Sequence, residues 1–110
     1  MVSIGKITYK GKSGKEYKFN IYDLKSSWTE DAVVYLVTRA EKKPDGGTTH
    51  HLIYIGQTDN LKTQFAYHNK QSCFDKNNAN RLCLIMEGNE KTRTSIESDL
   101  LANRKTPCND

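Results

Sequence analysis

The chain has 110 residues, of which 35% are hydrophobic and 27% are charged, and its formal net charge is +4. This length fits one domain that buries about two-thirds of the surface its unfolded chain exposes, so the core is real but small. No apolar run approaches the ~18 residues that a membrane span requires, and the first residues lack the apolar stretch of a signal peptide. We therefore expect a cytoplasmic protein that does not act in a membrane.

Residues 7–24 have the pattern of a β-hairpin. Tyr17, Phe19 and Ile21 alternate with polar residues, and residues 11–14 (GKSG) supply turn chemistry. The hairpin is rich in lysine, and a basic surface attracts polyanions through counterion release. The same lysines also solubilise a hairpin and protect its edge from pairing, so the pattern leaves both uses open.

Two apolar segments in the middle of the chain are predicted to be paired strands. Residues 32–38 (AVVYLVT) form a continuous, β-branched run, which is typical of a central strand covered on both faces. Residues 41–47 (EKKPDGG) are the strongest turn signal of the chain, and residues 49–56 (THHLIYIG) have the composition of a second strand. We expect the two strands to pair antiparallel.

A helix is predicted after the second strand. Thr58 or Asp59 is its expected cap, and Leu61 and Phe65, four residues apart, give it an inward face. The following residues 69–80 are mostly polar, so we expect a loop there.

The last part of the chain predicts one more strand and one more helix. Residues 81–87 (RLCLIME) indicate a third buried strand. Residues 89–105 predict a helix that Asn89 caps, with Ile96 and Leu100 facing inward.

The order hairpin, strand, strand, helix, strand, helix predicts an α+β fold with a small, mostly antiparallel sheet flanked by helices. We expect residues 1–30 to be an N-terminal hairpin extension packed on the same domain, and residues 31–110 to form its main part. The three cysteines, Cys73, Cys83 and Cys108, are widely spaced and include no CxxC pair. This spacing indicates neither a zinc knuckle nor a disulfide framework, so we expect three free thiols.

Two tyrosines lie on the paired strands. Period-two geometry places Tyr35 on the face of Val37, and it places Tyr54 on the face of Leu52 and Gly56. If the strands pair, both hydroxyls emerge together, and the missing side chain at Gly56 permits close approach of a ligand or of another backbone. The alternative is that both tyrosines are core aromatics whose hydroxyls reach water.

The two helices carry further polar candidates. Gln64 and His68 lie one turn apart on a shared face, which pairs an amide with an imidazole able to carry protons. Exposed residues of this kind are also common without any function. Glu97 lies one turn after Arg93, and this spacing fits either a surface ion pair of little energetic value or a carboxylate that binds a divalent cation.

Together these residues resemble the GIY-YIG nuclease family. Residues 33–35 (VVY) stand where the family has its first triplet, and residues 54–56 (YIG) match its second. The segment YIGQTDNL is similar to the family's strand-to-helix signature, and SIESDLL is similar to its glutamate helix. The resemblance covers residues 33–109.

The resemblance implies an α+β domain that hydrolyses phosphodiester bonds in DNA with one divalent metal, Mg²⁺ or Mn²⁺. It implies that Tyr35 and Tyr54 lie beside the attacking water and the scissile phosphate, where one of them helps to deprotonate the water. It also implies that His68 matches the family's helical histidine or tyrosine and that Glu97 binds the metal. Asn109 corresponds to the polar residue that supports the site near the end of the chain.

The sequence departs from the family at Gln64, where an arginine is expected. Arginine supplies a permanent charge in a bidentate fork for phosphate, whereas glutamine supplies only a neutral amide. Lys62 lies about 200° around the helix from Gln64, so it does not simply substitute for the arginine, although it remains a candidate contact for nucleic acid. The other candidates for such contacts are Gly56 and the arginines Arg39, Arg81 and Arg93.

Three hypotheses follow from the sequence. The first is a GIY-YIG-type endonuclease acting on DNA, with activity impaired by Gln64. The second is a nucleic-acid-binding module without catalysis, which Gln64 and the basic balance favour. The third is a protein-interaction domain that keeps only the fold, and no feature of the sequence favours it.

Overall fold

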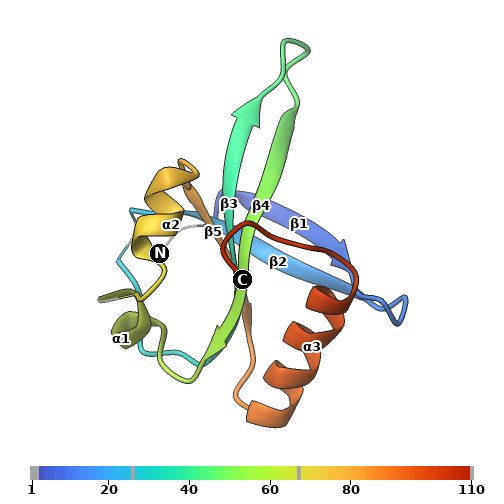
Figure 1. Ribbon diagram of the computed structural model, residues 1–110, viewed down its shortest axis with the longest axis vertical. Helices are drawn as coiled ribbons and strands as arrows, with labels where there is room; N and C mark the ends of the chain where they lie inside the picture. The colour runs from blue at the N-terminus through green and yellow to red at the C-terminus, as the bar shows by residue number, and fades with distance from the viewer. Residues whose placement is uncertain (1–2, 26, 67, 110) are drawn as a thin grey trace.

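The computed structural model describes residues 3–25, 27–66 and 68–109, which form a five-stranded antiparallel sheet and three helices (Figure 1). The strands are β1 (Gly5–Lys10), β2 (Glu16–Asp23), β3 (Val33–Lys42), β4 (Thr48–Thr58) and β5 (Arg81–Met86). The helices are α1 (Leu61–Ala66), α2 (Gln71–Lys76) and α3 (Glu90–Ala102). The predicted α+β fold with a small antiparallel sheet is therefore confirmed.

The strand order of the sheet is β1-β2-β5-β3-β4, and every neighbouring pair is antiparallel. β3 has a neighbour on each side, as its continuous apolar run predicts. The N-terminal hairpin of β1 and β2 joins the sheet at β5, where Asn20 pairs with Leu84 and Asp23 pairs with Arg81. The hairpin is thus part of the same sheet, and its lysines lie on one edge of it.

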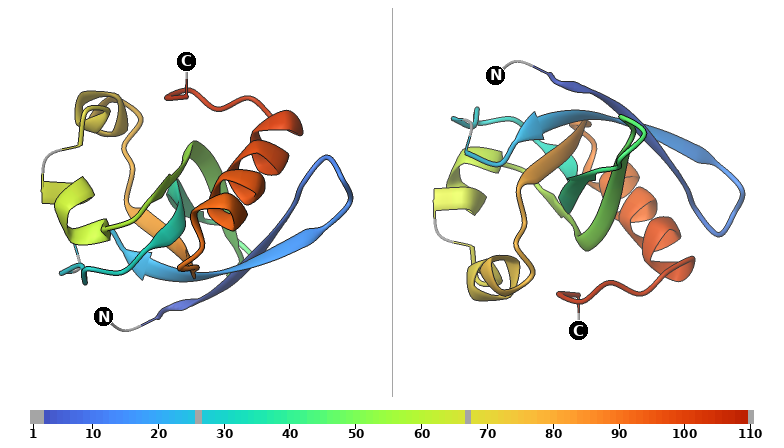
Figure 2. Two further views of the ribbon diagram at one scale, coloured as in Figure 1. Left: turned by 90° about the horizontal axis from the view of Figure 1, so that it is seen from below. Right: turned by 90° about the horizontal axis from the view of Figure 1, so that it is seen from above.

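Side chains of β3 alternate between two apolar clusters. Tyr35 and Val37 belong to one cluster together with residues of α1 and α2, whereas Leu36 belongs to a second cluster with Ile96 and Leu100 of α3. The sheet curls between these two layers, with α3 on one side and α1 and α2 on the other (Figure 2). Each fully buried aliphatic side chain contributes about 1.5–3 kcal/mol, so this double burial accounts for the position of β3 inside the sheet.

A β-bulge in β4 changes the predicted faces of the strand. Val37 pairs with Tyr54, but the next residue of β3 pairs with Leu52, so Ile53 is an extra residue on β4. Ile53 and Tyr54 both contact the cluster beside α1 and α2, whereas Leu52 contacts the cluster beneath α3. The prediction that Tyr54 shares a face with Leu52 is therefore wrong, because strict alternation does not continue through a bulge.

α1 has the predicted inward residues but a different cap. Leu61 is fully buried and Phe65 packs against the same cluster, as predicted. The capping side chain is Asn60, whose Oδ1 accepts a hydrogen bond from a backbone N–H of the first turn at 3.1 Å. Thr58 instead accepts a hydrogen bond from the Asn60 N–H at 3.2 Å, and Asp59 is exposed. The expected cap at Thr58 or Asp59 was therefore one or two residues too early.

α2 lies within residues 69–80, which the sequence predicted as a loop, and this prediction is wrong. The helix is one and a half turns long and carries one fully buried side chain, Phe74. A single apolar residue in a polar segment produces no helical periodicity, so the pattern could not indicate the helix.

α3 begins as predicted and ends earlier than predicted. The Asn89 side chain accepts a hydrogen bond from the Thr92 N–H, which caps the helix. The helix ends at Ala102 rather than at residue 105. In the part of the chain that the structure describes, no helix has the length and apolar character to cross a membrane.

Cys73 of α2 and Cys108 form a disulfide, which corrects the expectation of three free thiols. Only Cys83, buried in the sheet, is free among the described cysteines. The segment after α3 runs along the outer edge of β4, where the Cys108 N–H donates to the Ile53 carbonyl at 3.0 Å. The path of this segment places Cys108 beside Cys73 of α2, 35 residues earlier in the chain. The spacing of the cysteines along the sequence does not indicate whether two of them lie close enough to form a disulfide.

Candidate functional site

Tyr35 lies at the centre of the polar cluster that the fold assembles. Its ring is 1% exposed, and its position on β3 is directly opposite Gly56 of β4. A Cβ at residue 56 would lie 2.6 Å from the Tyr35 hydroxyl oxygen and 2.8 Å from the Tyr54 ring. Gly56 is therefore required for the close approach of the two tyrosines, which is the use that the sequence suggested for it.

His68 joins this cluster from the segment between α1 and α2. Because α1 ends at Ala66, the prediction that Gln64 and His68 share a helix face is wrong. Its Nε2 and the Tyr35 hydroxyl oxygen are 2.8 Å apart, and its Nδ1 accepts a hydrogen bond from the Lys70 N–H at 3.0 Å. Because Nδ1 is an acceptor, a neutral imidazole carries its proton on Nε2 and donates it to Tyr35. Burial and the positive charge of Lys70 lower the pKa of His68, so the neutral form is favoured.

Tyr54 lies beside Tyr35, with the two ring centroids 5.9 Å apart. Burial is the largest cause that raises the pKa of Tyr35, and the neighbouring Tyr54 raises it further. Burial also raises the pKa of Tyr54. The two phenols are therefore neighbours in the same buried environment, and His68 donates a hydrogen bond to the inner one, Tyr35.

Aromatic rings surround the polar cluster on its α1 and α2 side. The His68 ring centroid lies 4.8 Å from that of Phe74 and 5.1 Å from that of Phe65. Tyr54 also contacts Phe74, with the ring centroids 5.4 Å apart. Phe74 was missed from the sequence because its segment was predicted to be a loop, and its only signal was an apolar residue among polar ones.

Glu97 approaches both tyrosines from α3. The side chain is half-buried, and burial raises the pKa of its carboxyl. Its negative charge raises the pKa of Tyr35 and of Tyr54 in addition to the effect of burial, so it lies close enough to act on both phenols. Within the described residues no hydrogen bond or ion pair engages the Glu97 carboxylate, which leaves both oxygens available to a cation.

Arg93 does not pair with Glu97, so the predicted surface ion pair is wrong. The Arg93 side chain is 4% exposed, and its Nε donates to the Gln57 side-chain oxygen at 2.9 Å. One of its terminal nitrogens donates to the carbonyls of Glu87 and Gly88, both at 3.0 Å. Arg93 therefore attaches the start of α3 to β4, one turn before Glu97. Of its partners, only Gln57 comes from a segment distant in the sequence.

Asn109 supports the strand that carries Tyr54. Its side chain accepts a hydrogen bond from the Ile55 N–H and donates one to the Ile55 carbonyl, both at 2.8 Å. Thr106 donates a hydrogen bond to the same amide oxygen. The backbone next to Tyr54 is thereby held on its outer edge, which agrees with a supporting rather than a reacting position.

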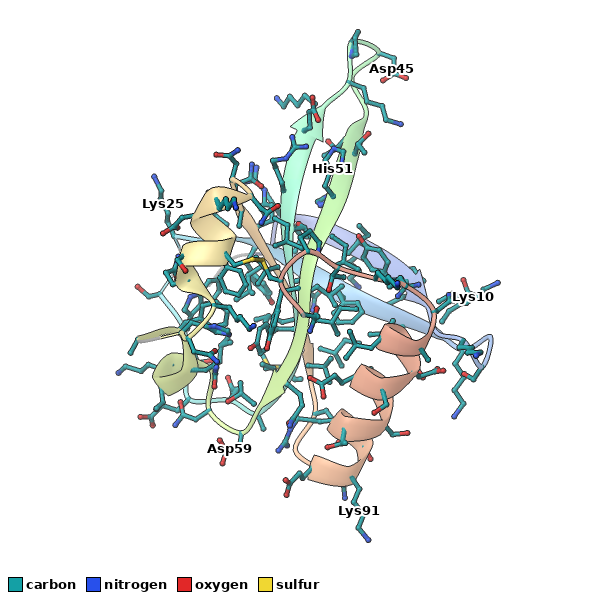
Figure 3. All side chains as sticks on the ribbon, viewed as in Figure 1. Lys10, Lys25, Asp45, His51, Asp59 and Lys91 are labelled. Atoms are coloured by element: carbon teal, nitrogen blue, oxygen red, sulfur yellow. A yellow bond between two sulfur atoms is a disulfide. The ribbon has the colours of Figure 1, made fainter. Side chains whose placement is uncertain are left out.

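Within the described residues, the side chains of the other three candidates make no hydrogen bond or ion pair with the tyrosines, His68 or Glu97. Gln64 is half-buried on α1, and Lys62 is exposed. Arg39 pairs with Glu41 at 3.1 Å on the exposed part of β3. Its cross-strand partner His51 lies on the hairpin arm (residues 39–51), which projects beyond the body of the sheet (Figure 3). Among the described residues, no arginine side chain has a hydrogen bond or ion pair to the tyrosines, His68 or Glu97.

No family model, curated protein or solved structure matches this chain. In the described ranges, no three side chains of His, Cys, Asp or Glu gather in a group that could hold a metal ion. Glu97 is therefore the one carboxylate that the cluster offers, a donor set that suits a hydrated Mg²⁺ completing its shell with water and phosphate oxygens. The arrangement can donate hydrogen bonds, bind a cation through one carboxylate and exclude water from one side.

Proposed function

We propose that this protein is a divalent-metal-dependent nuclease of the GIY-YIG type that hydrolyses phosphodiester bonds in DNA, with activity reduced by Gln64. The observation that carries the proposal is the approach of Tyr35 and Tyr54 across Gly56 on paired strands, with His68 hydrogen-bonded to Tyr35. The negative charge of Glu97 on α3 acts on both phenols. Tyr35, Tyr54 and Glu97 are also residues on which the resemblance to the GIY-YIG family rests. We expect the protein to act in the cytoplasm.

The hydrogen-bond chain supports a definite role for each side chain. Burial raises the pKa of both phenols, so both keep their protons at neutral pH. His68 donates to Tyr35 and so fixes this ring beside Tyr54, whose half-buried O–H would donate to a phosphoryl oxygen. A Mg²⁺ or Mn²⁺ ion bound by Glu97 would supply Lewis-acid polarisation and a more acidic water.

The cluster lacks the permanent positive charge that phosphoryl transfer commonly uses. Losing one donor that stabilises transition-state charge typically costs ~10²–10³-fold in rate, and Gln64 replaces such a donor with a neutral amide. Catalysis is therefore expected to be slow. The alternative function, a nucleic-acid-binding module without turnover, is favoured by the same residue and by the net charge of +4.

The test is cleavage of supercoiled plasmid DNA by the purified protein with Mg²⁺ or Mn²⁺. We expect slow nicking that Glu97→Gln abolishes. The matched control is Glu90→Gln, which removes the same charge from an exposed position of the same helix and is expected to keep wild-type activity. Equal residual nicking in the Glu97 variant and the wild type would mean that the cleavage comes from a contaminant, and this would reject the nuclease proposal.

Gln64→Arg separates the two candidate functions. If Gln64 alone limits the reaction, the substitution is expected to raise the cleavage rate by about 10²–10³-fold. Glu97→Gln in the Gln64→Arg background should remove this gain. Metal-independent binding of DNA with no cleavage in either protein would favour the binding module instead.

A further inference from the structure

A groove of about 450 Å³ lies between the start of the β1-β2 hairpin and the ends of β3 and β4 that form the hairpin arm. All five strands contribute to its lining, among them through Lys6, Ile21, Lys42, His50 and Arg81. Ile21 also belongs to the apolar cluster that α3 covers, so the groove lies on the α3 face of the sheet. The groove is separate from the tyrosine cluster, whose side chains face α1 and α2.

The groove is electropositive. Its ionisable lining residues are Lys6, Lys42, His50 and Arg81, and no aspartate or glutamate lines it. Neither lysine takes part in an ion pair with another described residue. Arg81 donates a hydrogen bond to the Asn80 carbonyl at 3.0 Å, and its nearest carboxylate is 3.9 Å away. Three permanent positive charges therefore share the groove with one loosely held counter-charge.

His50 adds an imidazole to the groove, and one of its ring nitrogens can bond to a molecule bound there. Its Nδ1 lies 3.2 Å from the Thr38 hydroxyl, so the opposite ring nitrogen is not used by that contact. Burial and the charge of Arg81 lower the pKa of His50, which places the imidazole close to the guanidinium. A neutral imidazole can donate to an anion through Nε2–H without adding to the repulsion between the positively charged side chains of the groove.

We infer that this groove binds phosphate groups of a nucleic-acid backbone at a second contact surface, away from the tyrosine cluster. The volume suits one or two phosphates, and the three permanent charges suit an anion rather than an apolar segment. The identity of the phosphate carrier rests on the proposed function. Affinity supplied here does not depend on Gln64, so the protein can hold DNA without the missing arginine.

The experiment compares two double variants that lose the same charge. Lys6→Gln with Lys42→Gln removes both groove lysines. Lys12→Gln with Lys15→Gln removes two exposed lysines from the turn between β1 and β2. Binding of a fluorescent DNA duplex is measured by anisotropy over a range of salt concentrations. EDTA is present throughout, so that cleavage does not enter the measurement.

For the groove variant we expect an affinity loss of at least 10-fold and a fall of about 2 in the slope of log K against log salt. For the variant with Lys12→Gln and Lys15→Gln, we expect the slope to fall by less than a third of the fall in the groove variant. Equal losses in the two variants would overturn the inference, since binding would then follow net charge alone. Saturable, groove-dependent binding of inorganic phosphate without binding of the duplex would also overturn it.

This result is independent of the nuclease test. Glu97→Gln should bind the duplex in EDTA with the wild-type salt slope, because Glu97 does not line the groove. A protein that binds through the groove but cleaves nothing would reject the nuclease and keep the groove. Cleavage by the wild type, together with an unchanged salt slope in the groove variant, would reject the groove and keep the nuclease.

Discussion

The hydroxyl end of Tyr35 occupies the space in which a side chain at Gly56 would begin, directly across from it on the neighbouring strand. The two residues belong to segments 21 positions apart in the sequence, and each is buried. The tyrosine can donate and accept hydrogen bonds inside the core only because the glycine leaves this space open.

Gly56→Ala is expected to destabilise the protein by about 1–3 kcal/mol, since the new methyl group forces a fully buried ring to move. The measurement is urea unfolding followed by circular dichroism. Gly88→Ala is the matched control, because a Cβ there meets no heavy atom within 4 Å, and it should change the stability by less than about 0.5 kcal/mol. Equal effects of the two substitutions would contradict the packing described for Tyr35.

The stability of the protein should decrease as the pH falls from 7 to 5. The pKa of His68 is lowered in the folded state, so the unfolded chain binds the proton more tightly, and folding loses stability as the pH falls below the unfolded value of about 6.5. Protonation would also remove the Nδ1 acceptor that bonds the Lys70 N–H. Above pH 7 the contribution of neutral His68 to the stability should be fully present.

Urea midpoints at pH 7 and pH 5 measure this effect. His68→Gln is expected to have a lower midpoint at pH 7 and a smaller fall between the two values. His50 also has a lowered pKa, so the part of the fall that remains in His68→Gln is expected to come from His50. An equal fall in His68→Gln and the wild type would contradict the role given to His68.

Reduction of the disulfide between Cys73 and Cys108 should lower the stability by about 3–4 kcal/mol, the loop-closure value for a loop of this length. It should also weaken the hydrogen bonds that the segment after α3 makes with Ile53 and Ile55. Urea unfolding with and without dithiothreitol measures the first effect, and hydrogen exchange of the Ile55 amide measures the second. A Cys73→Ser, Cys108→Ser double variant should resemble the reduced protein and should not respond to dithiothreitol.

Glu97→Gln is expected to lower the pKa of Tyr54, because the carboxylate charge is one of the causes that raise it. The measurement is the pH dependence of the Tyr54 ring carbon signal in an NMR titration, which needs neither metal nor substrate. Glu90→Gln removes an equal charge from the exposed start of α3 and should leave the Tyr54 titration unchanged. An unchanged Tyr54 titration in both variants would contradict an effect of the Glu97 charge on Tyr54.

Several elements of the fold could be predicted because their signals are local. The continuous apolar run of β3, the turn before β4 and the Asn89 cap each depend on neighbouring residues in the chain. The cap of α1 was misplaced and α2 was missed, since short helices with one or two buried residues have no periodicity to detect. The resemblance implies roles for Tyr35, Tyr54 and Glu97, but only the tertiary structure brings the two tyrosines together across Gly56.

The sequence by itself determined the five strands, the positions of α1 and α3, and which residues are chemically able to act, since the hydrophobic pattern and the side-chain chemistry are local properties of the chain. Only the tertiary structure decided the bulge beside Tyr54, the disulfide, the partners of Arg93 and the basic groove. Each of these depends on which distant segments meet. The free energy of such meetings comes from packing between elements, for which one sequence contains no separate local signal.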